Sequence, residues 1–169
     1  MQLVKPDGPI LRKVCRADFT VTMRDIMQMF VMLQDTKGLG LAAPQVGIDA
    51  RLFITVWGEV FVNPRVVEID GPVRSTEGCL SLPGITAQVD RWDKIRLADG
   101  RAYAGERAVV ILHEIDHMNG VLITDFPQPK RIPRVCTHAT TCHAAARPAS
   151  VGVLYAESPD PCAEAYPAL

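Results

Sequence analysis

Apolar residues recur at helical spacing near the start of the chain. The positions that share this spacing are Met23, Ile26, Met27, Phe30 and Leu33. Such intervals are typical of a helix with one buried face. Thr22 directly precedes the run and can cap it, and Asp25 three residues later completes a capping box. The pattern predicts a core helix that begins after Thr22, whose methionines fill the core and need no cofactor.

Alternating apolar and polar residues predict short strands in the next part of the chain. The apolar positions of these runs are Leu52, Ile54, Val56, Val60, Val62, Val66, Val67 and Ile69. We expect Gly71-Pro72 to close the last run, because this pair breaks regular structure. Two more strands are expected at 85–89 and 94–97, with Asp99-Gly100 as a hairpin turn after them. The pattern as a whole predicts a meander of short antiparallel strands.

A second helix is predicted over residues 107–118 and ends at Asn119-Gly120. Residues 121–124 resemble a final short strand. Further on, prolines mix with many alanines and no helical or strand period survives. We therefore expect one α+β domain over residues 1–126, with an N-terminal helix and with short antiparallel strands packed around the central second helix. An irregular or disordered Pro/Ala-rich tail is expected over 127–169.

Composition narrows the class of protein. The chain has 169 residues, enough for one domain with a real core. Its net charge of -1 gives no electrostatic reason to expect nucleic acid or an anionic membrane as a partner. No apolar run reaches membrane-spanning length, and the first residues lack the pattern of a secretory signal. Five cysteines without tight spacing suit a reducing compartment, so we expect a cytoplasmic protein.

The second helix carries an HExxH motif, His113-Glu114-Ile115-Asp116-His117. Histidines four residues apart lie on one face of a helix and can bind one metal ion. The carboxylate of Glu114 can reach a water at that ion without being a ligand. The apolar run over 109–112 indicates that this helix is buried. Two buried histidines and a buried glutamate are costly unless a metal neutralises and orients them.

A catalytic site of this kind needs a third protein ligand and one open position. One class of HExxH peptidase places a histidine six residues after the second one, but that position is Ile123 here. Another class uses a downstream glutamate, and the candidates Glu157 and Glu164 lie in the proline-rich tail. Cys79 fits better, because Gly78 beside it leaves room for an ion. A thiolate with two imidazoles binds Fe(II) or Zn(II) well.

A structural metal site is a third alternative, beside an amide hydrolase and an internal peptidase. It would need a fourth protein ligand, for which Cys136 is the nearest candidate thiol. The tail also contains Cys136, His138, Cys142 and His143, whose spacing matches no strong metal-binding pattern. A structural site would leave Glu114 without a purpose.

Three short segments match the motifs of a known family. They are Gly38-Leu39-Gly40-Leu41-Ala42-Ala43-Pro44-Gln45, Glu77-Gly78-Cys79-Leu80-Ser81 and His113-Glu114-Ile115-Asp116-His117. In this order they resemble the three motifs of the peptide deformylase family. Pro6-Asp7 with Leu11-Arg12 also resembles the start of that family, and the resemblance covers residues 5–126.

The resemblance implies a hydrolase that removes the formyl group from the initiator methionine of nascent polypeptides. It implies that Cys79, His113 and His117 hold one divalent metal, Fe(II) in the cell and Zn(II), Ni(II) or Co(II) in preparations. It further implies that Glu114 is the general base and then the general acid. Gln45 and the backbone N–H of Leu80 would be the oxyanion donors. Leu39, Gly40 and Gly78 would contact the substrate. N-formylmethionyl peptides are the expected substrates.

Four further positions qualify this resemblance. Leu112 stands where the family usually has glutamine, which removes a possible hydrogen bond behind a metal ligand. Val109 lies one turn before His113, where it lines the methionine pocket or is an ordinary core valine. Glu77 and Arg91 could pair behind the Cys79 segment, although charged side chains are more often solvated. The ribosome is a further possible partner, but no helical period after residue 126 predicts the C-terminal helix through which some family members dock on it.

Overall fold

The computed structural model describes residues 1–127, which form two helices, two sheets and three short 3-10 turns. The helices are α1 (Met23–Thr36) and α2 (Glu106–Met118), and the 3-10 turns are η1 (Pro9–Arg12), η2 (Ala43–Val46) and η3 (Ile123–Asp125). The strands are β1 (Gly40–Ala42), β2 (Leu52–Thr55), β3 (Val60–Val62), β4 (Val66–Cys79), β5 (Leu82–Leu97) and β6 (Ala102–Ala104). The sheet orders are β1-β2-β3 and β4-β5-β6, with every pairing antiparallel. The predicted α+β class with antiparallel strands is confirmed.

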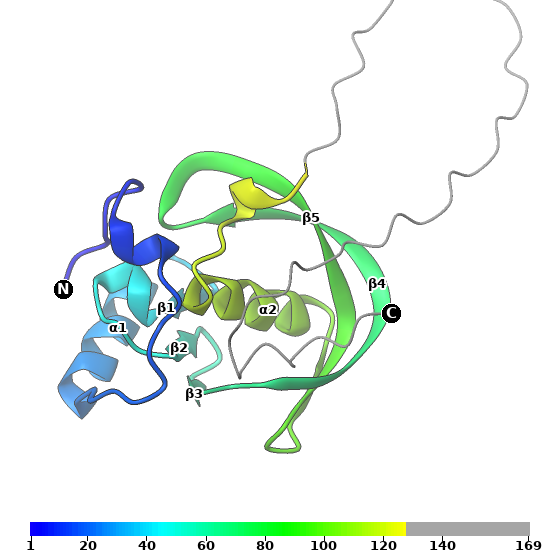
Figure 1. Ribbon diagram of the computed structural model, residues 1–169, viewed down its shortest axis with the longest axis horizontal. Helices are drawn as coiled ribbons and strands as arrows, with labels where there is room; N and C mark the ends of the chain where they lie inside the picture. The colour runs from blue at the N-terminus through cyan, green and yellow to red at the C-terminus, as the bar shows by residue number, and fades with distance from the viewer. Residues whose placement is uncertain (128–169) are drawn as a thin grey trace, which may run out of the picture. The chain divides into compact units, whose positions relative to one another are not determined.

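Figure 1 shows α2 between the first sheet with α1 on one side and the curved β4–β5 hairpin on the other. The hairpin bends around the helix, so that both sheets present residues to it. Among residues 1–127, no helix has the length and apolar content that crossing a membrane requires. The predicted tail and its candidate ligands lie outside the described residues, except for Pro127.

The capping box predicted for α1 is confirmed. The Thr22 hydroxyl accepts from the N–H of Asp25 at 3.2 Å, and the Thr22 N–H donates to the Asp25 carboxylate at 3.0 Å. The predicted buried face is only partly correct, because Met23 and Met27 are 72% and 57% exposed while Met29 is buried. Helical spacing alone does not distinguish a residue at the centre of the buried face from one at its border, because side chains three or four residues apart point in similar directions.

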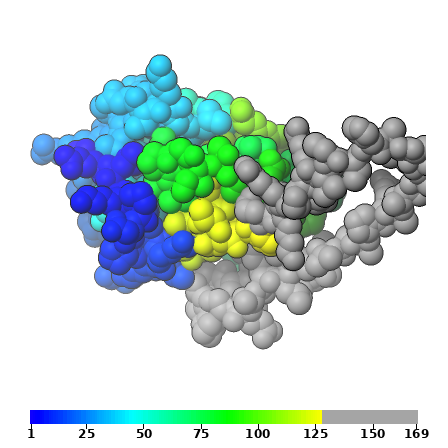
Figure 2. Space-filling model, turned by 90° about the horizontal axis from the view of Figure 1, so that it is seen from above, coloured from blue at the N-terminus to red at the C-terminus, as the bar shows by residue number. Residues whose placement is uncertain are grey.

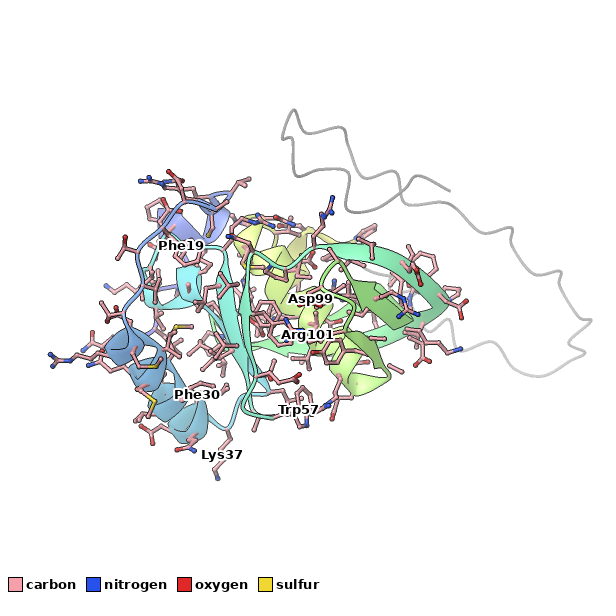
Figure 3. All side chains as sticks on the ribbon, turned by 90° about the horizontal axis from the view of Figure 1, so that it is seen from below. Phe19, Phe30, Lys37, Trp57, Asp99 and Arg101 are labelled. Carbon is pink, nitrogen blue, oxygen red and sulfur yellow. The ribbon has the colours of Figure 1, made fainter. Side chains whose placement is uncertain are left out.

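The core beside α1 is made by the helix and the first sheet. Its buried members are Met29, Leu33, Leu41, Ala43, Ala50, Leu52 and Ile54, and Phe30, which is labelled in Figure 3, packs against them. Every residue of β1 and β2 is buried. This packing holds β1, and with it the glycine-rich segment before Gln45, in a fixed position against α2.

The β4–β5 hairpin is longer than the sequence predicted. Strand β4 continues through Gly71-Pro72 to Cys79, and the two strands expected at 85–89 and 94–97 are one strand. Proline is tolerated here because β4 is an edge strand, where a missing N–H breaks no second ladder. The predicted hairpin turn at Asp99-Gly100 is confirmed, with Arg101 bonded to Asp99 at 2.8 Å (Figure 3).

The end of α2 packs against the N-terminal segment. Asn119-Gly120 ends the helix as predicted, and Gly120 has a φ of 72°. A Cβ at Gly120 would lie 2.7 Å from the backbone of Arg12, so only glycine fits this contact. The strand expected at 121–124 is wrong: the Asp125 carboxylate accepts from the N–H of Leu122 at 2.8 Å and closes η3 instead. Figure 2 shows the blue N-terminal residues beside this yellow segment.

Candidate active site

The two histidines of α2 and the last residue of β4 meet at one point. The Sγ of Cys79 lies 3.2 Å from Nε2 of His117, and one ligand atom from each of Cys79, His113 and His117 lies within 4.8 Å of the other two. The rings of His113 and His117 are inclined at 75° with centroids 4.9 Å apart. The three predicted ligands are therefore brought together by the fold.

This donor set fits one divalent metal ion. A tetrahedral ion with bonds of about 2.0–2.3 Å to nitrogen and sulfur needs ligand atoms that are mutually about 3–4 Å apart. Within residues 1–127, the group of His, Cys, Asp and Glu side chains whose ligand atoms come within 4.8 Å of one another has three members, and the Cys79–His117 distance of 3.2 Å lies in the required range. Three protein ligands are the pattern of a catalytic rather than a structural site, because a position stays open for water or substrate.

An ion-pair network orients His113 from behind. Nδ1 of His113 lies 2.8 Å from the Glu77 carboxylate, which itself accepts two 2.8 Å hydrogen bonds from Arg91. A third nitrogen of Arg91 donates to Asp116 at 2.6 Å, and the ring of Phe126 lies 5.2 Å from its guanidinium carbon. Glu77 and Arg91 thus form a buried pair rather than two solvated charges. The Nδ1 contact directs Nε2 of His113 toward the metal position.

The sequence analysis missed Asp116, although it lies inside the HExxH motif. Its spacing from His113 places it near the same face of α2, so an acidic residue there was a usable signal. Burial opposes ionisation of Glu77, but its bonds with Arg91 and His113 prevail and lower the pKa of Glu77 to about 2. The Glu77 carboxylate behind His113 therefore carries its negative charge at neutral pH.

The two histidines have opposite electrostatic environments. Burial alone would lower the pKa of His113, but its contacts with Cys79 and Glu77 raise it to about 10. Burial, together with the charge of His113, lowers the pKa of His117 well below its usual value. The contacts of His113 therefore favour its charged form, and a metal ion bound there would compete with that proton.

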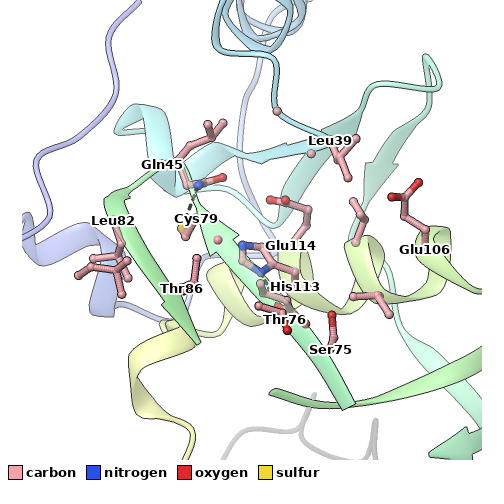
Figure 4. Close-up of a pocket in the computed structure, with 18 of the residues that line it drawn as sticks. Leu39, Gln45, Ser75, Thr76, Cys79, Leu82, Thr86, Glu106, His113 and Glu114 are labelled. Atoms are coloured by element: carbon pink, nitrogen blue, oxygen red, sulfur yellow. Dashed lines mark hydrogen bonds and ion pairs between the residues drawn. The ribbon is translucent and has the colours of Figure 1, made fainter. Parts of the chain in front are cut away.

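Glu114 lies at the centre of the site but is not one of the three clustered ligands. It is buried, and burial raises its pKa to about 7. Its carboxyl group fills the space in front of Gly40, where an added Cβ would collide with it. Glycine at position 40 is thus required by the close approach of this carboxyl group. Figure 4 shows Glu114 between α2 and the segment that carries Leu39.

Gln45 is held in the first turn of η2 with its amide aimed at Cys79. Its Oε1 accepts from the N–H of Ala42 at 2.8 Å, which fixes the amide orientation. Its Nε2 donates to the hydroxyl of Ser81 at 3.2 Å and lies 3.8 Å from Sγ of Cys79, the dashed contact in Figure 4. Ser81 was not recognised as a site residue from the sequence, although it belongs to the second motif.

A cleft of about 580 Å³ opens over these groups. The remaining predicted site residues, Leu39, Gly40, Gly78, Leu80 and Val109, all line it. Leu39 and Ile85 are exposed at its surface, and Val109 is half-buried rather than a fully enclosed core residue. Leu112, which replaces the glutamine usual in this family, is buried among apolar residues of α2.

Many known proteins are similar to this chain in sequence or in fold. A sequence model of the family described as polypeptide deformylase matches residues 1–131. A peptide deformylase from Clostridium botulinum is 42% identical over 130 residues, covering 69% of this chain and 88% of that protein, and one from Thermus thermophilus is 37% identical over 154 residues, covering 73% and 80%. The crystal structure of the Thermotoga maritima peptide deformylase is similar with a TM-score of 0.67 and 34% identity, covering 76% of this chain and 97% of that one. The chain belongs to the polypeptide deformylase family.

Proposed function

We propose that this protein removes the formyl group from N-formylmethionyl peptides at the start of nascent polypeptides. The observation that carries the proposal is the convergence of Cys79, His113 and His117 beside the buried carboxyl group of Glu114, at a cleft large enough for the end of a peptide. Family membership supports it. We assign the activity to residues 1–126, with α2 as the central helix of that domain.

Cys79, His113 and His117 would hold one divalent metal ion, which we propose to be Fe(II) in the cell, with Zn(II), Ni(II) or Co(II) able to take the same donors. When bound, such an ion supplies Lewis acidity, which acidifies a water and polarises the formyl carbonyl. A thiolate ligand favours a reducing compartment, which supports a cytoplasmic location. The Glu77–Arg91–Asp116 network keeps the His113 ring in the orientation that ligation requires.

Glu114 moves the proton in the proposed reaction. Its carboxylate accepts a proton from the attacking water as the water oxygen bonds to the formyl carbon. It then delivers that proton to the amine nitrogen as the C–N bond breaks, which releases formate and a free amino terminus. A carboxyl group whose pKa burial raises to about 7 is suited to both transfers near neutral pH.

Gln45 and Leu80 stabilise the negative charge that develops on the formyl oxygen. The Gln45 amide is already oriented by its bonds to Ala42 and Ser81, so little reorganisation is needed when the charge forms. The backbone N–H of Leu80 follows Cys79 directly and is the second proposed donor.

The peptide substrate would lie between two sheet edges. Strands β1 and β4 are each at the edge of their sheet, and residues 38–40 and 75–78 line opposite parts of the cleft. An extended peptide can pair with unpaired backbone groups of this kind. Leu39, Gly40 and Gly78 are the proposed contacts with the substrate backbone, and Val109 is proposed to line the pocket for the methionine side chain.

Formate release tests the proposed function. The full chain is loaded anaerobically with Fe(II), or with Ni(II), and assayed with formyl-Met peptides and with the same peptides unformylated. We expect formate from the first and no cleavage of the second. Glu114→Gln should abolish turnover while an exposed control, Glu68→Gln, keeps it. Gln45→Ala should lower kcat about a hundredfold or more, as loss of an oxyanion donor does.

Other results would identify the alternatives. Cleavage of unformylated peptides would indicate an internal peptidase, and tightly bound metal without any turnover would indicate a structural site. A Gln45→Ala enzyme with full activity would remove Gln45 from its proposed role.

Substitution of Val109 tests the methionine pocket. Val109→Phe should raise KM for formyl-Met peptides about tenfold, because it fills space that the substrate side chain would occupy. Val31→Phe, on the exposed face of α1, is the matched control and should leave KM unchanged. An unchanged KM in a folded Val109→Phe enzyme would make Val109 an ordinary packing residue.

A further inference from the structure

Thr55 at the end of β2 has a buried hydroxyl that neither the fold nor the proposed mechanism uses. The residue is fully buried, and its Oγ1 has no hydrogen-bond partner among residues 1–127. In that part of the chain, four buried side-chain polar atoms have no hydrogen-bond partner, and Oε2 of Glu114 is also one of the four. A buried polar group without a partner is costly, so two such atoms in one region require an explanation.

The strand register places the side chain of Thr55 on the same face of the first sheet as Gly40, against which the Glu114 carboxyl group lies. Thr55 is the direct partner of Gly40 across the β1–β2 pair, and opposite residues of an antiparallel pair point to the same side. The N–H of Val56 donates to the carbonyl of Leu39 at 2.9 Å, so Gly40 and Thr55 form the closer, non-hydrogen-bonded kind of pair. The Cβ of Thr55 and the position that a Cβ would take at Gly40 are therefore about 5 Å apart.

The carboxyl group of Glu114 fills the space that a Gly40 side chain would take. A Cβ built at Gly40 would lie 2.8 Å from both Cδ and Cγ of Glu114 and still closer to Oε1. The side chain of Thr55 stands beside that same space, on the same face of the sheet. A single water between the Thr55 hydroxyl and the Glu114 carboxyl group would have both as polar partners, and a buried water needs two to four.

We propose that Thr55 is a positioning residue for Glu114: its hydroxyl, through one bridging water, holds one oxygen of the carboxylate so that the other oxygen faces the reacting water. This inference rests on the proposed function, in which Glu114 carries the proton. A bridging water is nearly as favourable as a direct hydrogen bond and satisfies both buried atoms. Restricting the rotation of the carboxylate raises the fraction of time it spends in the reactive geometry.

Two substitutions separate the hydroxyl from the shape of the side chain. Thr55→Val keeps the volume and removes the hydroxyl, whereas Thr55→Ser keeps the hydroxyl. On the metal-loaded full chain, we expect Thr55→Val to lower kcat about tenfold with KM within about twofold of wild type, and Thr55→Ser to recover most of kcat. Thr36→Val is the matched control: its hydroxyl bonds only to backbone carbonyls of α1, and its kcat should be unchanged.

Melting temperature gives a readout that does not depend on turnover. A hydroxyl that was merely buried and unpaired would make Thr55→Val more stable than wild type, because the substitution would remove a desolvated polar group. We expect instead an equal or lower melting temperature with unchanged metal content.

Three results would overturn the inference: a Thr55→Val enzyme with wild-type kcat, a Thr55→Ser enzyme as slow as Thr55→Val, or a raised melting temperature of Thr55→Val. If the valine variant does not fold, a high-resolution crystal structure of the wild type decides, since the inference requires a water bonded to both Thr55 and Glu114. A wild-type enzyme that releases no formate would instead refute the proposed function, which is a distinguishable failure.

Discussion

The two strands β4 and β5 carry two different kinds of ion pair. Near α2, Arg91 and Glu77 are only 3% and 6% exposed in their side chains, and Glu77 contacts His113. Asp90 directly precedes Arg91 and so points to the other face of the same strands, where Arg74 and Asp90 are 52% and 56% exposed. The other exposed pairs on the hairpin are Lys94–Asp70 and Arg96–Glu68.

Register distinguishes the two kinds. The exposed pairs all join residues directly opposite each other across the strands. The buried pair does not, because Glu77 lies opposite Ala87 and Arg91 lies opposite Val73. The exposed pairs therefore accompany strand pairing, whereas the buried pair is set by the demands of His113 and α2. Ion pairs on one hairpin can thus contribute very different amounts to the free energy of unfolding.

The largest expected effect follows removal of the buried cation. Arg91→Met leaves Glu77 and Asp116 buried without their counter-charge, which should lower the free energy of unfolding by about 3–5 kcal/mol. It should also weaken metal binding, because His113 loses its orientation. Urea unfolding and metal content after dialysis measure both effects. A loss below about 1 kcal/mol would make the buried pair equivalent to the exposed ones.

An intermediate effect is expected from pH. The pKa of Glu77 in the folded protein is about 2, below its ordinary value of 4.5, so its stabilising contribution is complete above that ordinary value and is lost as pH falls toward 2. Between about pH 5 and pH 3, the metal-free wild type should lose roughly 2 kcal/mol more stability than Glu77→Gln. Urea unfolding at both pH values measures this difference. Equal losses in the two proteins would contradict the assignment.

The smallest effect is expected on the exposed part of the hairpin. Arg74→Met should change the free energy of unfolding by at most about 1 kcal/mol, and raised salt should reduce that change further, because exposed pairs are screened. Formate release should remain at the wild-type rate. A change as large as that of Arg91→Met would show that the hairpin, rather than the site, depends on these charges.

Local patterns predicted much of this fold. The cap of α1, the extent of α2 and the Asp99-Gly100 turn depend on neighbouring residues, and each was confirmed. The prediction failed at Gly71-Pro72, where a local breaking signal was overridden by pairing with β5 along an edge strand. It also failed at 121–124, where the apolar residues suggested a strand but the carboxylate of Asp125 closes a turn.

What the sequence determined by itself was the set of side chains that the proposed chemistry uses: Cys79, His113 and His117, the glutamate between the histidines and the glutamine of the first motif, because short motifs list the side chains a reaction needs. Only the tertiary structure decided how those side chains are held. Bonds among Arg91, Glu77 and Asp116, and the placement of Thr55 opposite Gly40, join segments distant along the chain. Their existence depends on burial and strand register, which are set by packing rather than by any local pattern.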